Sequence, residues 1–188
     1  MNLIKLSSEL IRFKSVTPNS AGSLEFIEKI LTKNNFNCYL LEFGNKKIKN
    51  LYAEIKGGKG PNLCFAGHTD VVPAGNLKDW ATNPFKPTIK NGVLYGRGAS
   101  DMKTAIAAFV HASLEFLSSC KNKFDGSLSF LLTADEEGEA DFGTKSMVNW
   151  LKKKKHKIDL CLVGEPTNPN YLGEMIKVGR RGSLNGEI

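Results

Sequence analysis

The chain has 188 residues, of which 41% are hydrophobic and 24% are charged. These values predict one globular domain with a core of ordinary size, and no stretch of about 18 consecutive apolar residues is present to span a membrane. The formal net charge is +7, but much of the positive excess lies in residues 152–157, which lack interleaved aromatic side chains. We therefore expect neither nucleic-acid nor membrane partners, and we interpret the charge as mild steering of small anionic substrates.

Apolar periodicity and turn residues predict strands that alternate with helices. Helical spacing of apolar residues occurs at 3–14, 23–34, 101–119 and 144–153. Strand-like runs occur at 36–43, 51–55, 62–66, 128–133 and 158–163, with a strand pair or extended segment at 171–178. A hairpin is expected around Asn91-Gly92, with residues 93–95 as its second arm. This order indicates an α/β domain with a mixed, largely parallel sheet sandwiched by helices.

The four cysteines are Cys38, Cys64, Cys120 and Cys161. They form no Cys-x-x-Cys pair, and three of them lie in apolar strand-like runs. We expect buried, reduced thiols that do not bind zinc, as in a cytoplasmic protein. Residues 1–6 lack the features of a secretory signal, which also favours the cytoplasm. The last residues, 182–188, read as the interior of a strand, so we expect an N-terminal piece of a longer protein.

Four short polar motifs each follow an apolar run, at 68–70, 100–103, 135–138 and 164–167. The carboxyl ends of parallel strands gather at one edge of an α/β sheet, where ligands bind. One histidine and several carboxylates at such an edge have the composition of a hydrolytic metal site, for which zinc is the expected ion. Each motif alone has a simpler interpretation, such as a polar turn, a helix N-terminal acid or a solvated acidic loop. Their agreement favours the metal site.

The chemistry of such a site assigns different tasks to its acids. Glu136 and Glu137 are adjacent, so their carboxylates point in different directions, and one can bind metal while the other accepts a proton from water. A metal-binding histidine usually donates its second ring N–H to a carboxylate or carbonyl, a role that suits Asp70 beside His68.

These motifs resemble those of the di-zinc aminoacylase/carboxypeptidase family, through residues 67–73, 94–103, 135–138 and 163–167. The resemblance runs along essentially the whole chain. Residues 15–19, Trp80 with Pro84-Phe85, and 176–184 favour the family members that remove succinate from an N-succinyl amino acid. The resemblance implies a zinc-exopeptidase-like fold, with residues 1–178 as the N-terminal part of the catalytic domain. Residues 179–188 would begin an inserted dimerisation domain, or lid, and the intact enzyme would be a homodimer.

The resemblance also implies a ligand set for two Zn²⁺ ions, which Co²⁺ can replace. His68 and Glu165 would bind one ion, Glu137 would bind the other, and Asp101 would bridge the two.

The remaining implied roles concern the reaction. Glu136 would act as general base, and Asp70 would support His68. Arg180 would hold a carboxylate of a small anionic N-succinyl amino-acid substrate, for which a guanidinium is well suited.

One departure from the family pattern affects the expected activity. The family takes a further zinc-binding histidine, and a histidine that acts in the transition state, from later regions that this sequence does not contain. We therefore expect this chain alone to lack a complete second zinc site and to be weakly active or inactive. The alternatives are an acetylornithine deacetylase or metallo-carboxypeptidase of the same family, or a non-catalytic metal-binding fragment.

Overall fold

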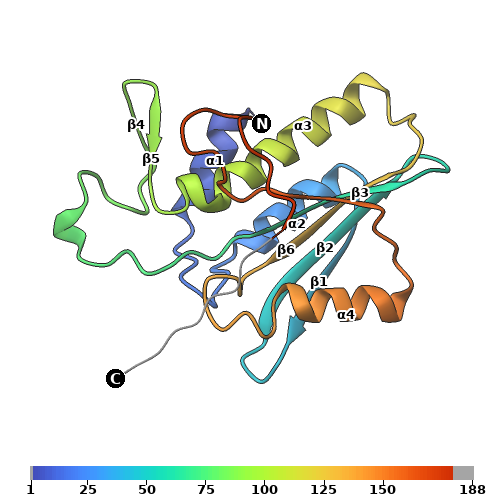
Figure 1. Cartoon of the computed structure of the whole chain (residues 1–188), viewed down its shortest axis with the longest axis horizontal. Coiled ribbons are helices and arrows are strands. Elements are labelled where there is room, and N and C mark those ends of the chain that lie inside the picture. The colour runs from blue at the N-terminus through green and yellow to red at the C-terminus, as the bar shows by residue number, and fades with distance from the viewer. Residues whose placement is uncertain (1, 180–188) are drawn as a thin grey trace.

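A computed structural model of the chain describes residues 2–179 (Figure 1). Its helices are α1 (Leu3–Arg12), α2 (Ser23–Lys33), α3 (Thr104–Ser119) and α4 (Thr144–Lys154), with two short helical turns, η1 (Leu77–Asp79) and η2 (Ala99–Lys103). Its strands are β1 (Asn37–Phe43), β2 (Ile48–Lys56), β3 (Asn62–His68), β4 (Thr88–Lys90), β5 (Val93–Tyr95), β6 (Ser127–Thr133) and β7 (Leu160–Val163). Arg180 and the rest of the predicted lid segment after residue 179 lie outside the described residues.

The main sheet is mixed, as the sequence predicted. Its strand order is β1-β2-β6-β3-β7. The β1–β2 and β2–β6 pairs are antiparallel, whereas β3 pairs in parallel with both β6 and β7. Four strands therefore run in one direction and β2 runs against them. The hairpin β4–β5 forms a separate sheet around Asn91 and Gly92, whose φ angles of 51° and 78° are those of its tight turn.

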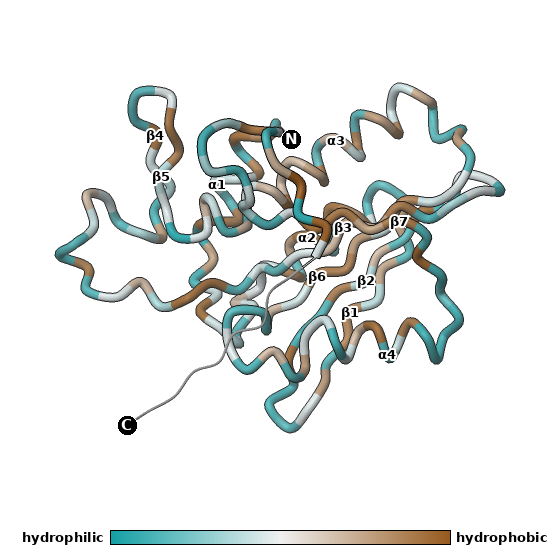
Figure 2. The backbone as a smooth tube through the Cα atoms, viewed as in Figure 1, coloured by the Kyte–Doolittle hydropathy of each residue, from teal (hydrophilic) through white to brown (hydrophobic). Residues whose placement is uncertain are grey.

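Helices cover both faces of the sheet, as predicted. Figure 1 shows α1, α2 and α3 on one side and α4 on the other. Alternate residues of β6 face these two layers: Phe130 and Leu132 belong to the core beneath α1–α3, and Leu131 belongs to the core beneath α4. Each buried apolar side chain of this size contributes about 1.5–3 kcal/mol. The hydrophobic residues of the central strands are brown in Figure 2.

Two predicted elements differ in the structure. The helix expected from Asp101 begins at Thr104, because Asp101 itself has extended φ and ψ angles of −127° and 101°. A strand pair or an extended segment was expected at 171–178, and the described residues contain no strand there. In its place, the Glu174 carboxylate accepts the N–H groups of Asn170 and Tyr171 and closes a turn. A carboxylate that binds these N–H groups withdraws them from strand pairing.

The cysteines are less buried than predicted, and all four are free thiols. Only Cys64 is buried, Cys38 and Cys120 are partly buried, and Cys161 is exposed. Cys161 lies on β7, an edge strand whose four residues are all exposed. Edge position, rather than apolar sequence, decides the exposure of this thiol.

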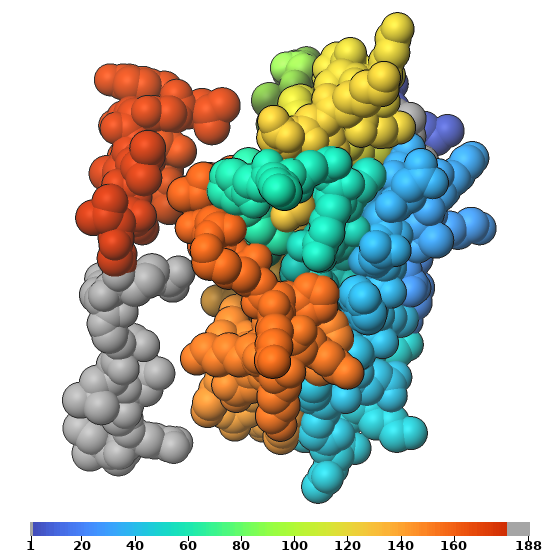
Figure 3. Space-filling model, turned by 90° about the vertical axis from the view of Figure 1, so that its right-hand side faces the viewer, coloured from blue at the N-terminus to red at the C-terminus, as the bar shows by residue number. Residues whose placement is uncertain are grey.

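Exposed apolar side chains gather on β7 and on the segment after it. Leu160 and Leu162 of β7 are exposed, as are Leu172, Ile176 and Val178. Figure 3 shows this segment, in red, along one side of the molecular surface. Among the described residues, no helix has the length and apolar character needed to cross a membrane.

Candidate metal centre

Three adjacent parallel strands deliver the predicted site residues to one edge of the sheet. His68 is the last residue of β3, the Glu136-Glu137 pair follows β6, and Glu165 follows β7. Asp101 comes from the η2 turn, which packs against β3. The sheet therefore brings together residues that are up to about a hundred positions apart in the sequence, as expected for the carboxyl edge of parallel strands.

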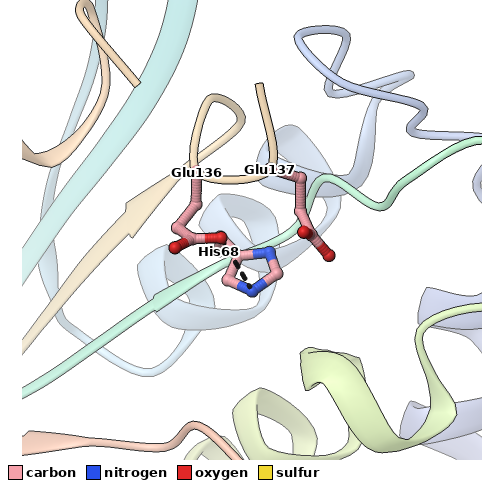
Figure 4. Close-up of side chains that lie close together, drawn as sticks. All are labelled: His68, Glu136 and Glu137. Carbon is pink, nitrogen blue, oxygen red and sulfur yellow. Dashed lines mark ion pairs between the residues drawn. The ribbon is translucent and has the colours of Figure 1, made fainter. Parts of the chain in front are cut away.

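Three carboxylates surround the imidazole of His68. Its Nε2 atom lies 3.0 Å from Asp101 Oδ1, 3.6 Å from Glu165 Oε1 and 3.8 Å from Glu136 Oε2. Figure 4 shows that Glu136 and Glu137 extend from the same loop, with the Glu136 carboxylate directed toward the ring and the Glu137 side chain beside it. The His68 side chain is only 1% exposed, whereas that of Asp101 is 47% exposed. The cluster is thus buried at its base and open to solvent on one side.

Two overlapping sets of ligand atoms have the spacing that a metal ion needs. His68, Glu136 and Glu137 form one set, and His68, Asp101 and Glu165 form the other. Within each set the ligand atoms lie within 4.8 Å of one another. All five residues predicted as metal ligands or general base therefore belong to one cluster, whereas Arg180 lies outside the described residues.

Asp70 links the histidine to the acidic loop. Its Oδ2 atom accepts hydrogen bonds from the backbone N–H groups of Glu136 and Glu137, each at 3.0 Å. Its Oδ1 atom lies 3.5 Å from His68 Nδ1, and its carbonyl oxygen lies 2.9 Å from the same nitrogen. When Nδ1–H donates to this carbonyl, Nε2 is the ring nitrogen that faces the acidic cluster. The side chain of Asp70 is 0% exposed, so these contacts are shielded from water.

A segment near the N-terminus supports the Asp70 loop. Ser15 Oγ donates to the carbonyl of Thr69 at 2.6 Å, and the backbone of Ser15 accepts from the N–H of Val71 at 2.9 Å. Thr17 N–H in turn donates to Val71. The sequence identified residues 15–19 only as a point of family resemblance. Their structural role required a contact across more than fifty residues, which no local pattern reports.

Lys103 is a buried cation that sequence reasoning left without a role. It is 0% exposed, and its Nζ donates to the carbonyl of Phe13 at 2.8 Å. Burial lowers the pKa of Lys103 to about 8, although the negative charge of Asp70 opposes this shift. No local pattern at 100–103 indicates this burial, because it depends on a contact with Phe13, which lies 90 positions away. Lys103 ties the η2 turn to the end of α1.

Small residues allow the strand ends to approach each other. A Cβ atom on Gly164 would lie 2.5 Å from Phe65 Cζ and 3.0 Å from Met102 Cε. A Cβ atom on Gly67 would lie 2.5 Å from the same Met102 Cε. Glycine before Glu165 therefore lets the chain after β7 pack directly on the buried side chains beneath the cluster.

Burial and mutual repulsion disfavour the ionised forms of the carboxylic acids in the cluster. Burial is the main cause that raises the pKa of Asp101, Glu136 and Glu137. The charge of Glu165 raises the first two further, and the charge of Asp101 does the same for Glu137. A cation placed among these groups would remove the repulsion and favour their ionised forms.

His68 and Asp70 show the opposite balance. Burial disfavours the charged form of each, but their mutual hydrogen bond outweighs it and lowers the pKa of Asp70. Hydrogen bonds to Asp70 and Glu165 likewise raise the pKa of His68 to about 11. The imidazole thus carries the positive charge that the surrounding carboxylates require.

The donor set fits divalent cations. It combines one imidazole nitrogen with carboxylate oxygens, which are ligands that zinc and neighbouring transition metals accept. The ring is fixed through its Nδ1 atom. The carboxylates around the ring carry more negative charge than one bound proton can neutralise. A separate cavity lies at the opposite end of the sheet. It has a volume of about 640 Å³ and is lined by charged residues that include Lys56, Lys59 and Asp159.

Comparison with known proteins supports this interpretation. A family described as Peptidase family M20/M25/M40 matches residues 64–180. The chain is 57% identical to a succinyl-diaminopimelate desuccinylase of Pelagibacter ubique (strain HTCC1062), over 100% of this chain and 49% of that protein. It is 51% identical to a succinyl-diaminopimelate desuccinylase of Wolbachia pipientis wMel, over 98% of this chain and 46% of that protein. The chain thus spans about half the length of these curated relatives.

Solved structures share the fold at low sequence identity. Human carnosine dipeptidase 1 superposes with a TM-score of 0.76 at 20% identity, over 86% of this chain and 37% of that chain. The M20 family metallo-carboxypeptidase Sso-CP2 of Sulfolobus solfataricus gives a TM-score of 0.71 at 23% identity, over 87% of this chain and 37% of that chain. The family match covers more than half of the sequence and agrees with the resemblance that the motifs carried. The chain belongs to the M20/M25/M40 family of peptidases.

Proposed function

We propose that this chain supplies the metal-binding half of the active site of an amide hydrolase. The substrate would be N-succinyl-LL-2,6-diaminopimelate, and the products would be succinate and LL-2,6-diaminopimelate, a step in lysine and cell-wall biosynthesis. The convergence of His68 with carboxylates from three separate loops carries the proposal. The relatives named succinyl-diaminopimelate desuccinylase, at up to 57% identity, support the choice of substrate.

The proposed cofactor is a pair of zinc ions, which cobalt can replace. His68 and Glu165 would hold one ion, Glu137 the other, and Asp101 would contact both. The ligand set of His68, Asp101 and Glu165 supports the first position, and Glu137 belongs to the second set beside it. A structurally similar Bacillus subtilis protein, YXEP, is described as a dinuclear metal-binding peptidase from the M20 family, with a TM-score of 0.58. When bound, such ions would polarise the amide carbonyl and make water a stronger acid.

Glu136 is proposed as the group that moves protons. Its side chain is 40% exposed and reaches the open side of the cluster, so it can meet both water and substrate. It would accept a proton as a water oxygen attacks the amide carbonyl, and return a proton to the nitrogen as the carbon–nitrogen bond breaks. The raised pKa of Glu136 suits both transfers, because a base that is too weak would neither accept nor hold the proton.

Asp70 would act through its neighbours rather than on the substrate. Its hydrogen bonds to two N–H groups hold the Glu136-Glu137 loop, and its contacts with Nδ1 hold the ring of His68. It therefore couples the orientation of the base to that of the metal-binding imidazole.

The remaining parts of the proposal concern the polypeptide that this chain does not cover. We infer that the other half of the relatives' length supplies a further metal-binding histidine and a histidine that acts in the transition state. Arg180 would bind a substrate carboxylate, residues 179–188 would begin an inserted lid domain, and the intact enzyme would be a cytoplasmic homodimer. A biosynthetic substrate of this class supports the cytoplasmic location.

A chimera tests the activity. Residues 1–188 would be joined to the part of the Pelagibacter ubique relative that they do not cover, and assayed with zinc on N-succinyl-LL-2,6-diaminopimelate and on N-acetylornithine. We expect hydrolysis of the succinyl substrate and a loss of at least about 10²-fold in kcat for Glu136→Gln, with zinc binding retained. The matched control, Glu139→Gln, changes a nearby exposed acid.

Each outcome of this assay has a definite meaning. A chimera that folds and binds zinc but leaves the succinyl amide intact would contradict the proposed reaction. Preference for N-acetylornithine would assign the site to a deacetylase. Near-normal kcat in Glu136→Gln would remove that residue as the base. Absence of zinc from the isolated 188-residue chain after zinc-replete purification would contradict the ligand assignment.

A further inference from the structure

Two free thiols face each other across the parallel pair β3–β7. Cys64 and Cys161 are register partners in these strands. Register partners in a sheet project to the same face, and neighbouring strands lie about 4.7–4.9 Å apart. That spacing lies within the range of about 4.4–6.8 Å between Cα atoms that a disulfide bridges. Figure 2 shows β7 directly beside β3.

The two thiols are close enough to perturb each other, although they differ in exposure. Each side chain is the largest cause of the shift in the pKa of the other. Cys64 is buried in the core beneath α4, where its Sγ also lies 3.6 Å from the carbonyl oxygen of Phe65. Cys161 is exposed, because β7 pairs on one side only among the strands of residues 2–179. The Cys161 sulfur is therefore accessible to a soluble oxidant, and the Cys64 sulfur is buried next to it.

The acidity of the pair follows this difference. The hydrogen bond from Cys64 lowers the pKa of Cys161 to about 7, although burial opposes the shift. The same hydrogen bond, together with burial, raises the pKa of Cys64. The thiolate therefore resides on the exposed sulfur, and the thiolate is the form that peroxides oxidise.

We propose that Cys64 and Cys161 form a peroxide-oxidisable dithiol whose disulfide links β3 to β7. The Cys161 thiolate attacks hydrogen peroxide, the O–O bond breaks, and one water leaves once the hydroxide is protonated, which gives a sulfenic acid on Cys161. The Cys64 thiol then attacks that sulfur, loses its proton, and releases the hydroxyl group as a second water. Two thiols are oxidised to one disulfide, and one peroxide is reduced to two waters.

The position of the pair gives the disulfide a structural consequence. Cys64 lies four residues before His68, and Cys161 lies four residues before Glu165. The bond would therefore lock together the two strands that end in these residues. The proposal itself requires only the thiol geometry and remains testable if the site binds no metal.

Peptide mapping tests the proposal on the 188-residue chain. The reduced, folded protein would be treated with hydrogen peroxide, blocked with iodoacetamide and digested without reductant. We expect a peptide pair that joins Cys64 to Cys161, lighter by two hydrogen atoms than the sum of its parts and separated by dithiothreitol. Cys64→Ser should instead accumulate a dimedone-reactive sulfenic acid on Cys161, while the control Cys120→Ser should form the same disulfide as the unaltered chain.

A urea-unfolded sample distinguishes native geometry from random pairing and does not depend on any variant folding. There, the four thiols should pair without preference for Cys64 and Cys161. The proposal is overturned if folded protein yields Cys161 sulfinic acid while Cys64 remains fully alkylated. It is also overturned if peroxide produces chiefly Cys161-linked dimers on a non-reducing gel, or the same mixture of pairings in the folded and unfolded chain.

Discussion

Replacement of Asp70 by asparagine separates the charge of this residue from its shape. The asparagine carbonyl can still accept the N–H groups of Glu136 and Glu137. Its amide nitrogen must then occupy the place of Oδ1, 3.5 Å from His68 Nδ1, where a second donor faces the ring N–H. The variant also removes the negative charge that favours the orientation of the imidazole.

The size of the expected effect follows from these contacts. Hydrogen bonds to a charged group contribute about 1.5–3 kcal/mol, and loss of a group that orients a metal-binding histidine typically lowers metal affinity by about 10–100-fold. We therefore expect Asp70→Asn to lose about 1.5–3 kcal/mol of unfolding free energy without metal, and about 10–100-fold in zinc affinity.

Two measurements check this prediction at pH 7. Urea unfolding with a chelator, followed by tryptophan fluorescence, reports the free energy of unfolding, and competition with a chromophoric chelator reports zinc affinity. Because the folded-state pKa of Asp70 is lowered, its stabilisation is present above the unfolded-state value near about 3.9 and is lost as the pH falls through the folded value. Wild type and variant should therefore converge in acid. The control is Asp79→Asn, an exposed acid in η1. Equal behaviour of the two variants at pH 7 would refute the role assigned to Asp70.

Three further predictions follow from other contacts of the site. Gly164→Ala should cost about 1–3 kcal/mol in urea unfolding and weaken zinc binding, because its Cβ would lie 2.5 Å from Phe65 Cζ; an unchanged midpoint would contradict this. Metal-free protein should lose up to about 1.4 kcal/mol per pH unit between about pH 6.5 and 8, because the pKa of His68 is raised to about 11 and its stabilisation fades as the pH rises toward that value. A flat profile there, or the same slope in His68→Gln, would count against it. Lys103→Met should cost about 1–3 kcal/mol, because the carbonyl of Phe13 loses its buried donor; wild-type stability would show that this hydrogen bond contributes nothing net.

The strand-forming and helix-forming segments were largely predictable from local pattern. Apolar spacing identified α1, α2 and α4 to within a few residues, and Asn91-Gly92 identified the hairpin. The start of α3 was not predictable in this way, because Asp101 is held in an extended conformation by tertiary contacts of the η2 turn. Likewise, the apolar residues at 171–178 suggested strands, but a strand also requires a partner and free N–H groups.

The members of the metal cluster were recognisable because each is a strong ligand type placed after an apolar run. Their arrangement was not, since register decides it. A shift of β3 against β6 by one residue would turn His68 to the other face of the sheet. The support from Ser15, the burial of Lys103 and the pairing of Cys64 with Cys161 also depend on contacts between distant segments.

The sequence by itself determined the residue types, the alternation of strands and helices, and the family to which the motifs belong, because each of these is encoded within a few neighbouring positions. The tertiary structure alone decided which atoms meet. It placed four loops on one sheet edge, set the Asp70 carboxylate between an imidazole and two backbone N–H groups, and left Cys161 exposed in front of a buried partner. The distances between these side chains, their burial and the charges around them are set only when the strands pair in one register. The pKa values and the metal affinity follow from these three properties.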